Sequence, residues 1–240
     1  MLTLSDHLRL LAKDAEFKIP SSISKLAFAL SISKNPYVEK DYDLRCIFIH
    51  VPKAAGTSLR RALYGTKSFH IPAVRYQTAD PERFETCFKF CFVRNPWDRL
   101  LSAYEYLKKR CDADMNFPDH RWAASNLTEY KSFHDFVISL EDEKIRKSIK
   151  KYIHFRDQID WISSSGMNKK ILMNFVGRYE KFQTDYTEIC SALDLPAPNL
   201  PSERKSTHGQ NYREIYTARM VDLVGDIYGA DIDAFGYDFE

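Results

Sequence analysis

The chain has 240 residues, 44% of them hydrophobic, which is a normal fraction for a globular protein long enough to bury a core. Lysine and arginine number 35 against 33 acidic residues, and this balance gives no case for a nucleic-acid coat or an acidic-surface partner. The five cysteines show neither a disulfide framework nor zinc spacing, which favours a reducing compartment.

The first 43 residues are a mixed segment, in which Pro20 separates two short amphipathic pieces. We interpret them as an N-terminal extension that packs against the main domain. Charged residues interrupt the early apolar positions, so no secretory signal is predicted, and the longest apolar segment, Leu26 to Ile32, is too short to cross a bilayer. We therefore expect a cytoplasmic protein without a transmembrane segment.

Residues 46–51 form a short apolar run that predicts one buried strand, and Pro52 ends it because proline brings no N–H group to a sheet. Gly56 allows the main chain to approach a ligand closely, and the next two residues, Thr57 and Ser58, are good helix starters. The unit is therefore predicted to be a strand, a tight loop and a helix.

The loop of this unit predicts an anion site, because free N–H groups and the positive end of the helix converge there. Lys53 adds a full charge. The pattern is not a Walker A loop, in which lysine directly precedes the hydroxyl residue. The predicted anion-binding residues are Pro52, Lys53, Ala54, Ala55, Gly56, Thr57, Ser58 and Leu59.

Two short elements and a second strand are predicted next. Residues 69–71 have the composition of a brief strand that Pro72 ends, and Pro81 introduces a short helical piece. Residues 88–93 predict a second buried strand, which places Arg94 at its carboxyl end.

A helix follows this second strand. Asn95 is a good N-cap and Pro96 fits a first helical turn, which places Ser102 about two turns into the helix.

Together, the two motifs resemble the carbohydrate-type (family 2) sulfotransferase domain. Pro-Lys-x-x-Gly-Thr-Ser is similar to the loop that binds the 5′-phosphosulfate of 3′-phosphoadenosine-5′-phosphosulfate (PAPS). Phe-Val-Arg-Asn-Pro-Trp-Asp-Arg-Leu-x-Ser-Ala-Tyr is similar to the 3′-phosphate site, with Arg94 and Ser102 as the gripping residues. The resemblance covers roughly residues 45–239 and implies a P-loop-NTPase-like sulfotransferase fold.

The alternation of apolar runs with helical patterns independently predicts a single three-layer α/β domain over residues 1–240, with a mostly parallel central sheet. Residues 111–131 have the character of a polar, irregular insertion, either an acceptor-binding lid or a plain surface excursion. Further elements are expected at 133–140 (helix), 145–149 (helix), 175–179 (strand), 180–193 (helix) and 213–228 (helix).

The resemblance also implies a mechanism: PAPS donates the sulfuryl group, PAP is the product, Lys53 stabilises the leaving phosphate and a histidine is the base. We expect His70 to be that base and His154 to be its main competitor, and we interpret His50 as a core histidine of the first strand. The basic loop that contains Arg204 and Lys205 lies where sulfotransferases close over the nucleotide. No metal signature is present in the sequence.

Two other classes stay open, a P-loop-type nucleotide kinase and a non-catalytic PAP-binding protein of the same fold. The resemblance implies a hydroxyl-bearing acceptor, a glycan or a glycolipid, and no nucleic-acid partner. The sequence does not define the oligomeric state.

Overall fold

The computed structural model describes residues 35–65, 69–112, 115–166, 168–197 and 211–239. These residues divide into two compact units. The sheet unit comprises residues 35–94 and 158–197, and the helical unit comprises residues 95–157 and 211–239. A single domain over residues 1–240 stays a prediction, and most of the expected N-terminal extension lies outside the described residues.

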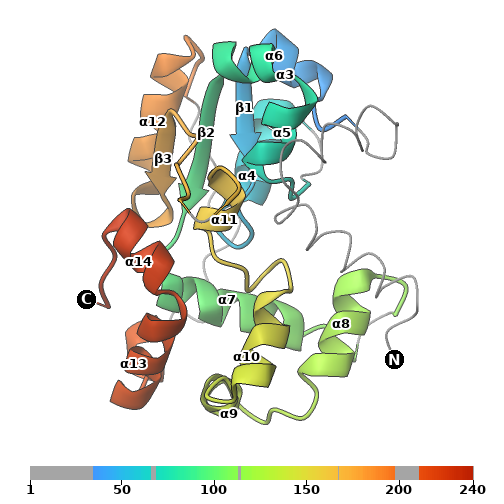
Figure 1. Ribbon diagram of the computed structural model, residues 1–240, viewed down its shortest axis with the longest axis vertical. Helices are drawn as coiled ribbons and strands as arrows, with labels where there is room; N and C mark the ends of the chain where they lie inside the picture. Colours follow the sequence, from blue (N-terminus) through green and yellow to red (C-terminus); the bar gives the residue numbers. More distant parts are fainter. Residues whose placement is uncertain (1–34, 66–68, 113–114, 167, 198–210, 240) are drawn as a thin grey trace. The chain divides into compact units, whose positions relative to one another are not determined.

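The sheet unit is built on three parallel strands in the order β1-β2-β3 (Figure 1). Their bounds are β1 (Cys46–Ile49), β2 (Phe88–Val93) and β3 (Phe175–Arg178). Cys46 lies opposite Phe88, and Phe90 lies opposite Phe175. Strands β1 and β2 are almost fully buried, which is why each is a continuous apolar run. The α/β class and the parallel sheet predicted from the sequence are therefore confirmed, and the strands that precede Pro52 and Arg94 are direct neighbours.

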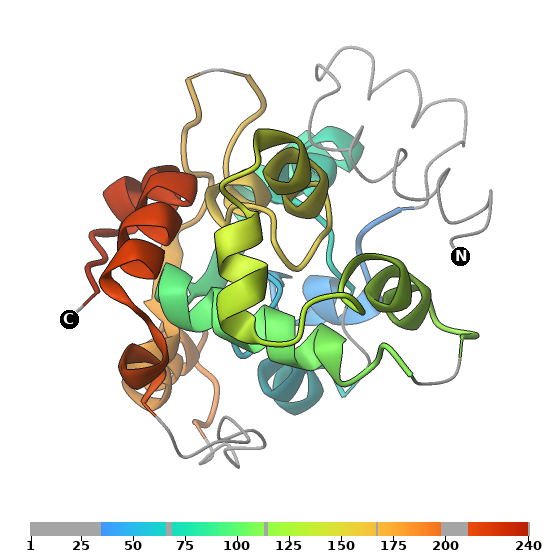
Figure 2. The ribbon, with the colours of Figure 1, turned by 90° about the horizontal axis from the view of Figure 1, so that it is seen from below.

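Helices cover both faces of this sheet. Figures 1 and 2 agree in placing α5 on one face and α4 and α12 on the other. The ring of Phe182 in α12 packs 4.8 Å, centroid to centroid, from that of Phe92 in β2. The unit contains α3 (Glu39–Asp43), α4 (Gly56–Tyr64), α5 (Ala73–Ala79), α6 (Pro81–Thr86), α11 (Ile159–Ile162), η1 (Tyr179–Lys181) and α12 (Phe182–Ala192).

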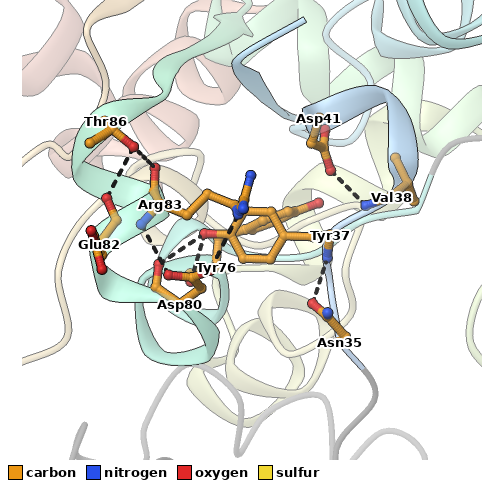
Figure 3. A network of polar contacts seen from close by, with 9 residues as sticks. All are labelled: Asn35, Tyr37, Val38, Asp41, Tyr76, Asp80, Glu82, Arg83 and Thr86. Atoms are coloured by element: carbon orange, nitrogen blue, oxygen red, sulfur yellow. Dashed lines mark hydrogen bonds and ion pairs between the residues drawn. The ribbon is translucent and has the colours of Figure 1, made fainter. Parts of the chain in front are cut away.

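The segment before β1 is bound to the junction of α5 and α6 (Figure 3). The Tyr37 hydroxyl donates to the carbonyl oxygens of Tyr76 and Asp80, at 3.0 and 3.2 Å. Asp80 in turn caps α6 by accepting from the backbone N–H of Arg83 at 3.0 Å. These contacts connect the segment that precedes β1 to α5, the helix that follows His70.

The helical unit has a core of stacked aromatic rings. Trp122 and Tyr152 lie parallel with centroids 3.8 Å apart, and Tyr104 stacks on Phe136 at 5.0 Å. Its elements are α7 (Pro96–Lys108), α8 (Pro118–Asn126), α9 (Phe133–Ser139), α10 (Glu143–Lys150), η2 (Tyr212–Ile215), α13 (Ala218–Ile227) and α14 (Gly229–Phe235). As predicted, Asn95 caps α7 by accepting from the backbone N–H of Trp97 at 3.1 Å.

Several expectations are corrected. Residues 69–72 are not a strand: Phe69 is 69% exposed, and the run is too short to pair before Pro72 leads into α5. Residues 111–131 are not simply irregular, because α8 lies within them and buries Trp122.

Two predicted elements also have different bounds. The helix expected over 213–228 is divided into η2 and α13. Strand β1 ends at Ile49, which leaves His50 in the loop rather than in the strand.

Candidate active site

The loop between β1 and α4, residues 51–55, is the candidate anion cradle and has two residues in a strained backbone conformation. Lys53 and Ala55 have φ values of 69° and 63°, in the left-handed region, which costs a residue with a Cβ about 1–2 kcal/mol. Such strain gathers at functional sites, and the turns it produces aim successive N–H groups at one point. The N-cap residue of α4 is Ala55, whose methyl side chain accepts no hydrogen bond from the N–H groups of the first turn.

Gly56, the first residue of α4, is required for a steric reason. A Cβ added there would lie 1.8 Å from Cδ2 and 2.1 Å from Nε2 of His50. The sequence predicts that this glycine admits a ligand, but the closest neighbour of the absent side chain is the His50 ring. His50 is 6% exposed and lies directly after β1.

Arg94 connects the carboxyl ends of all three strands within the sheet unit. It follows β2 and is 6% exposed. Its guanidinium donates to the carbonyl oxygen of Lys53, after β1, at 3.4 Å, and lies 4.2 Å from the ring centroid of Tyr179, after β3. In open α/β sheets, ligands bind at this edge.

Gln158 holds the main chain of Arg94 at both polar groups. Its Oε1 accepts from the Arg94 N–H at 2.9 Å, and its Nε2 donates to the Arg94 carbonyl at 2.8 Å. Gln158 is fully buried. Where β2 ends, the side-chain amide of Gln158 thus forms the two backbone hydrogen bonds that a neighbouring strand would otherwise form. These bonds fix the backbone of Arg94, from which its side chain extends.

His70 lies beside the cradle although its segment is not a strand. Its Nδ1 is 3.0 Å from the carbonyl oxygen of His50. Because a carbonyl oxygen only accepts, Nδ1 carries the proton, and the neutral ring has its lone pair on Nε2. The ring centroids of His70 and His50 are 4.1 Å apart, and Trp161 in α11 makes an edge contact with His70 at 5.9 Å.

His154 belongs to the helical unit, where its Nε2 is 3.2 Å from Oδ2 of Asp119 in α8. The hydroxyls of Tyr106 and Tyr152 also donate to this carboxylate. Burial raises the pKa of Asp119, but the hydrogen bond and charge of His154, with the two tyrosine bonds, outweigh burial and hold the pKa well below its usual range. Nδ1 of His154 is buried, and Nε2 faces the carboxylate. The role of His154 as the competing base stays a prediction.

The predicted site residues are thus distributed unequally. Lys53, His70 and Arg94 belong to the sheet unit, where Lys53 and Arg94 are in direct contact. Ser102 is half-buried on α7 in the helical unit. Arg204 and Lys205 lie outside the described residues.

Three residues of the site were missed by sequence reasoning. His50 was assigned to the core of a strand, and only the position of that strand's end corrects this. Tyr179 directly follows β3, as Arg94 follows β2, and the same strand-end rule would have found it. Gln158 carries no such signal, because its partner lies 64 residues away in the chain.

The sheet unit, with three parallel strands and helices on both faces, defines an α/β protein. A family model described as "Sulfotransferase family" (Sulfotransfer_2) matches residues 36–238, so the chain belongs to the sulfotransferase family, in its family 2 group. It is similar to an uncharacterized protein of Archaeoglobus fulgidus, with 30% identity over 132 residues, which are 55% of this chain and 88% of that protein. No solved structure matches the chain.

Neither a membrane span nor a metal cluster is present within the described residue ranges. Within those ranges, no helix is long and apolar enough to span a bilayer. The same residues contain no group of three or more histidine, cysteine, aspartate or glutamate side chains arranged to hold a metal ion.

Proposed function

We propose that the protein transfers the sulfuryl group of PAPS to a hydroxyl group of a carbohydrate acceptor by in-line displacement. Membership of the sulfotransferase family supports sulfuryl transfer in general. The observation that carries the more specific proposal is the uncapped, strained cradle at the start of α4, with Lys53 in its loop and Arg94 bonded to it. Two cationic side chains and a helix N-terminus suit a ligand with two anionic groups.

The donor site is proposed from the same residues. Residues 52–59 would bind the 5′-phosphosulfate through backbone N–H groups and the Lys53 ammonium. Arg94 and Ser102 would bind the 3′-phosphate, since a guanidinium matches the oxygens of a phosphate. Arg204 and Lys205 would close over the nucleotide. The bound donor supplies an activated sulfuryl group on a phosphate leaving group.

In the proposed reaction, His70 is the general base and Lys53 stabilises the leaving group. His70 Nε2 accepts the proton of the acceptor hydroxyl while that oxygen bonds to sulfur. Lys53 neutralises the charge that develops on the phosphate oxygen as its bond to sulfur breaks. The Nδ1 contact with the His50 carbonyl supports this role, because it leaves Nε2 as the basic nitrogen.

The acceptor class, the location and the metal requirement belong to the proposal as well. The proposed acceptor is a glycan or a glycolipid, on the basis of the family resemblance. The proposed location is the cytoplasm, and the proposed reaction needs neither a metal ion nor nucleic acid, on the basis of composition and motifs. The acceptor is the least constrained of these, because no described residue is assigned to it.

Transfer of label tests the proposal. The protein is incubated with ³⁵S-PAPS and a panel of glycans, glycolipids and phenols, with and without EDTA. We expect labelled glycan in both conditions and none with Lys53→Ala. Phosphate transfer from ATP with magnesium, or tight PAP binding without transfer to any member of the panel, would overturn the proposal in favour of a kinase or a binding protein.

A further inference from the structure

His50 lies between the anion cradle and the proposed base, and it takes no part in the proposed reaction. It is the first residue after β1 and its side chain is buried. Phe48, two residues earlier, lies nearly parallel to it, with an interplanar angle of 20° and centroids 5.8 Å apart. The ring therefore packs beside Phe48 on the strand side.

On the side of the cradle, the His50 ring occupies the space that a side chain at residue 56 would need. Three of its atoms, Cδ2, Nε2 and Cγ, lie 1.8, 2.1 and 2.5 Å from the position of a Cβ on Gly56. The ring therefore touches the main chain of the first turn of α4. Its position sets how closely that turn, with its N–H groups, approaches the end of β1.

On the side of the base, His50 contacts His70 twice. Its carbonyl oxygen accepts from Nδ1 of His70 at 3.0 Å, and the two rings lie 4.1 Å apart, centroid to centroid. Trp161 borders His70 from α11. One residue thus contacts the helix turn through its ring and determines the tautomer of His70 through its backbone.

We infer that His50 is a positioning residue that aligns His70 with the anion cradle. The inference rests on the proposed function, in which the cradle holds the phosphosulfate and His70 removes the acceptor's proton. In-line transfer requires these groups in a fixed geometry, and a misplacement of about 1 Å costs roughly a hundredfold in rate. A flat ring between glycine and a second imidazole supplies that geometry without touching substrate.

The test is a double-mutant cycle between residues 50 and 56, with PAP affinity measured by titration calorimetry. Gly56→Ala in the wild-type background places a methyl group in the His50 ring and should weaken PAP binding by about thirtyfold. In the His50→Ala background the methyl group has room, so the same change should cost about threefold or less. His50→Phe, which keeps a flat ring, should bind PAP within about threefold of the wild type.

A second readout follows His70 directly and needs neither nucleotide nor acceptor. The carbonyl of residue 50 is present in every variant, but the ring of His50, 4.1 Å away, packs the His70 ring against that carbonyl. The ¹⁵N resonances of the His70 ring should therefore report the Nδ1–H tautomer in the wild type and in His50→Phe, and a mixture of tautomers in His50→Ala, where no ring keeps His70 at the carbonyl. Phe84→Leu is the matched control. Phe84 is a buried ring of the same unit, in α6 and close to Lys89, so its truncation should lower the Tm without changing the tautomer of His70.

The outcomes separate the inference from the proposed function. Additive effects of Gly56→Ala and His50→Ala on PAP affinity, or an unchanged His70 tautomer in His50→Ala, would overturn the inference. If the wild type binds no PAP, the proposed function fails. In that case the His70 resonances and the Tm values of the four proteins of the cycle still test the role of His50. Non-additive Tm values together with loss of the His70 tautomer would support the positioning role, and additive Tm values would overturn it.

Discussion

Replacement of Gln158 by methionine tests whether the sheet edge depends on this side chain. Methionine has a similar volume and cannot form the two hydrogen bonds that Gln158 makes with the Arg94 main chain at 2.9 and 2.8 Å. Since Gln158 is fully buried, water does not replace these bonds easily. Each unpaired backbone group costs about 1–3 kcal/mol, so the variant, with two such groups, should lose roughly 2–6 kcal/mol of folding free energy.

That loss is large enough to measure in two ways. For a protein of this size, about 2–4 °C of Tm corresponds to each kcal/mol, so the Tm should fall by roughly 4–24 °C. PAP affinity, measured by calorimetry below the transition, should fall about tenfold because the base of the Arg94 side chain loses its support.

Gln183→Met is the control for this substitution. Gln183 is exposed on α12 in the same unit, so the same change there should leave both the Tm and PAP affinity unaltered. A Gln158→Met protein with wild-type Tm and PAP affinity would show that the amide bonds neither stabilise the fold nor position Arg94.

Three further predictions concern Arg94, His70 and Asp119. Arg94→Ala should weaken PAP binding by about 2–3 kcal/mol in calorimetry and barely affect AMP, which lacks the 3′-phosphate; equal losses for both would remove Arg94 from that phosphate. His70→Ala should lower kcat for transfer from PAPS by roughly 10²–10⁴-fold with little change in PAP affinity, and near-normal turnover beside an inactive His154→Ala would move the role to His154. Asp119→Asn should cost about 1–3 kcal/mol of stability at neutral pH. Because the folded-state pKa of Asp119 is lowered, its contribution is complete above the ordinary aspartate pKa of about 4 and declines as the pH falls below it. Chemical denaturation at pH 7, 5, 4 and 3 should therefore show the wild type and Asp119→Asn converging at the acid end, and a constant difference would contradict the low pKa.

Sequence reasoning recovered the elements that local chemistry determines. The strands were predictable because a short, fully apolar run has few alternatives to a buried strand. The start of α7 was predictable because Asn95 and Pro96 act on their own helix turn. The segment 69–71 was assigned wrongly since composition alone does not show whether a partner strand exists.

The candidate site was recovered only in part, for a related reason. Lys53 and Arg94 belong to motifs that are contiguous in the sequence. The sequence does not indicate the positive φ values of Lys53 and Ala55, because neither residue is glycine, the residue type that usually adopts them. Gln158 and His50 act through contacts with residues far along the chain or around a turn, and neither periodicity nor spacing encodes such contacts.

The central claim is that the cradle at the start of α4 and Arg94 bind a nucleotide with two phosphate groups. Calorimetric titration of the wild-type protein with PAP and with AMP tests it without knowledge of the acceptor. The account predicts that PAP binds about 10–150-fold more tightly than AMP, the range for one charge-assisted hydrogen bond of about 1.5–3 kcal/mol, and that magnesium changes neither affinity. Equal affinities for PAP and AMP, or tighter binding of ATP in the presence of magnesium, would contradict it.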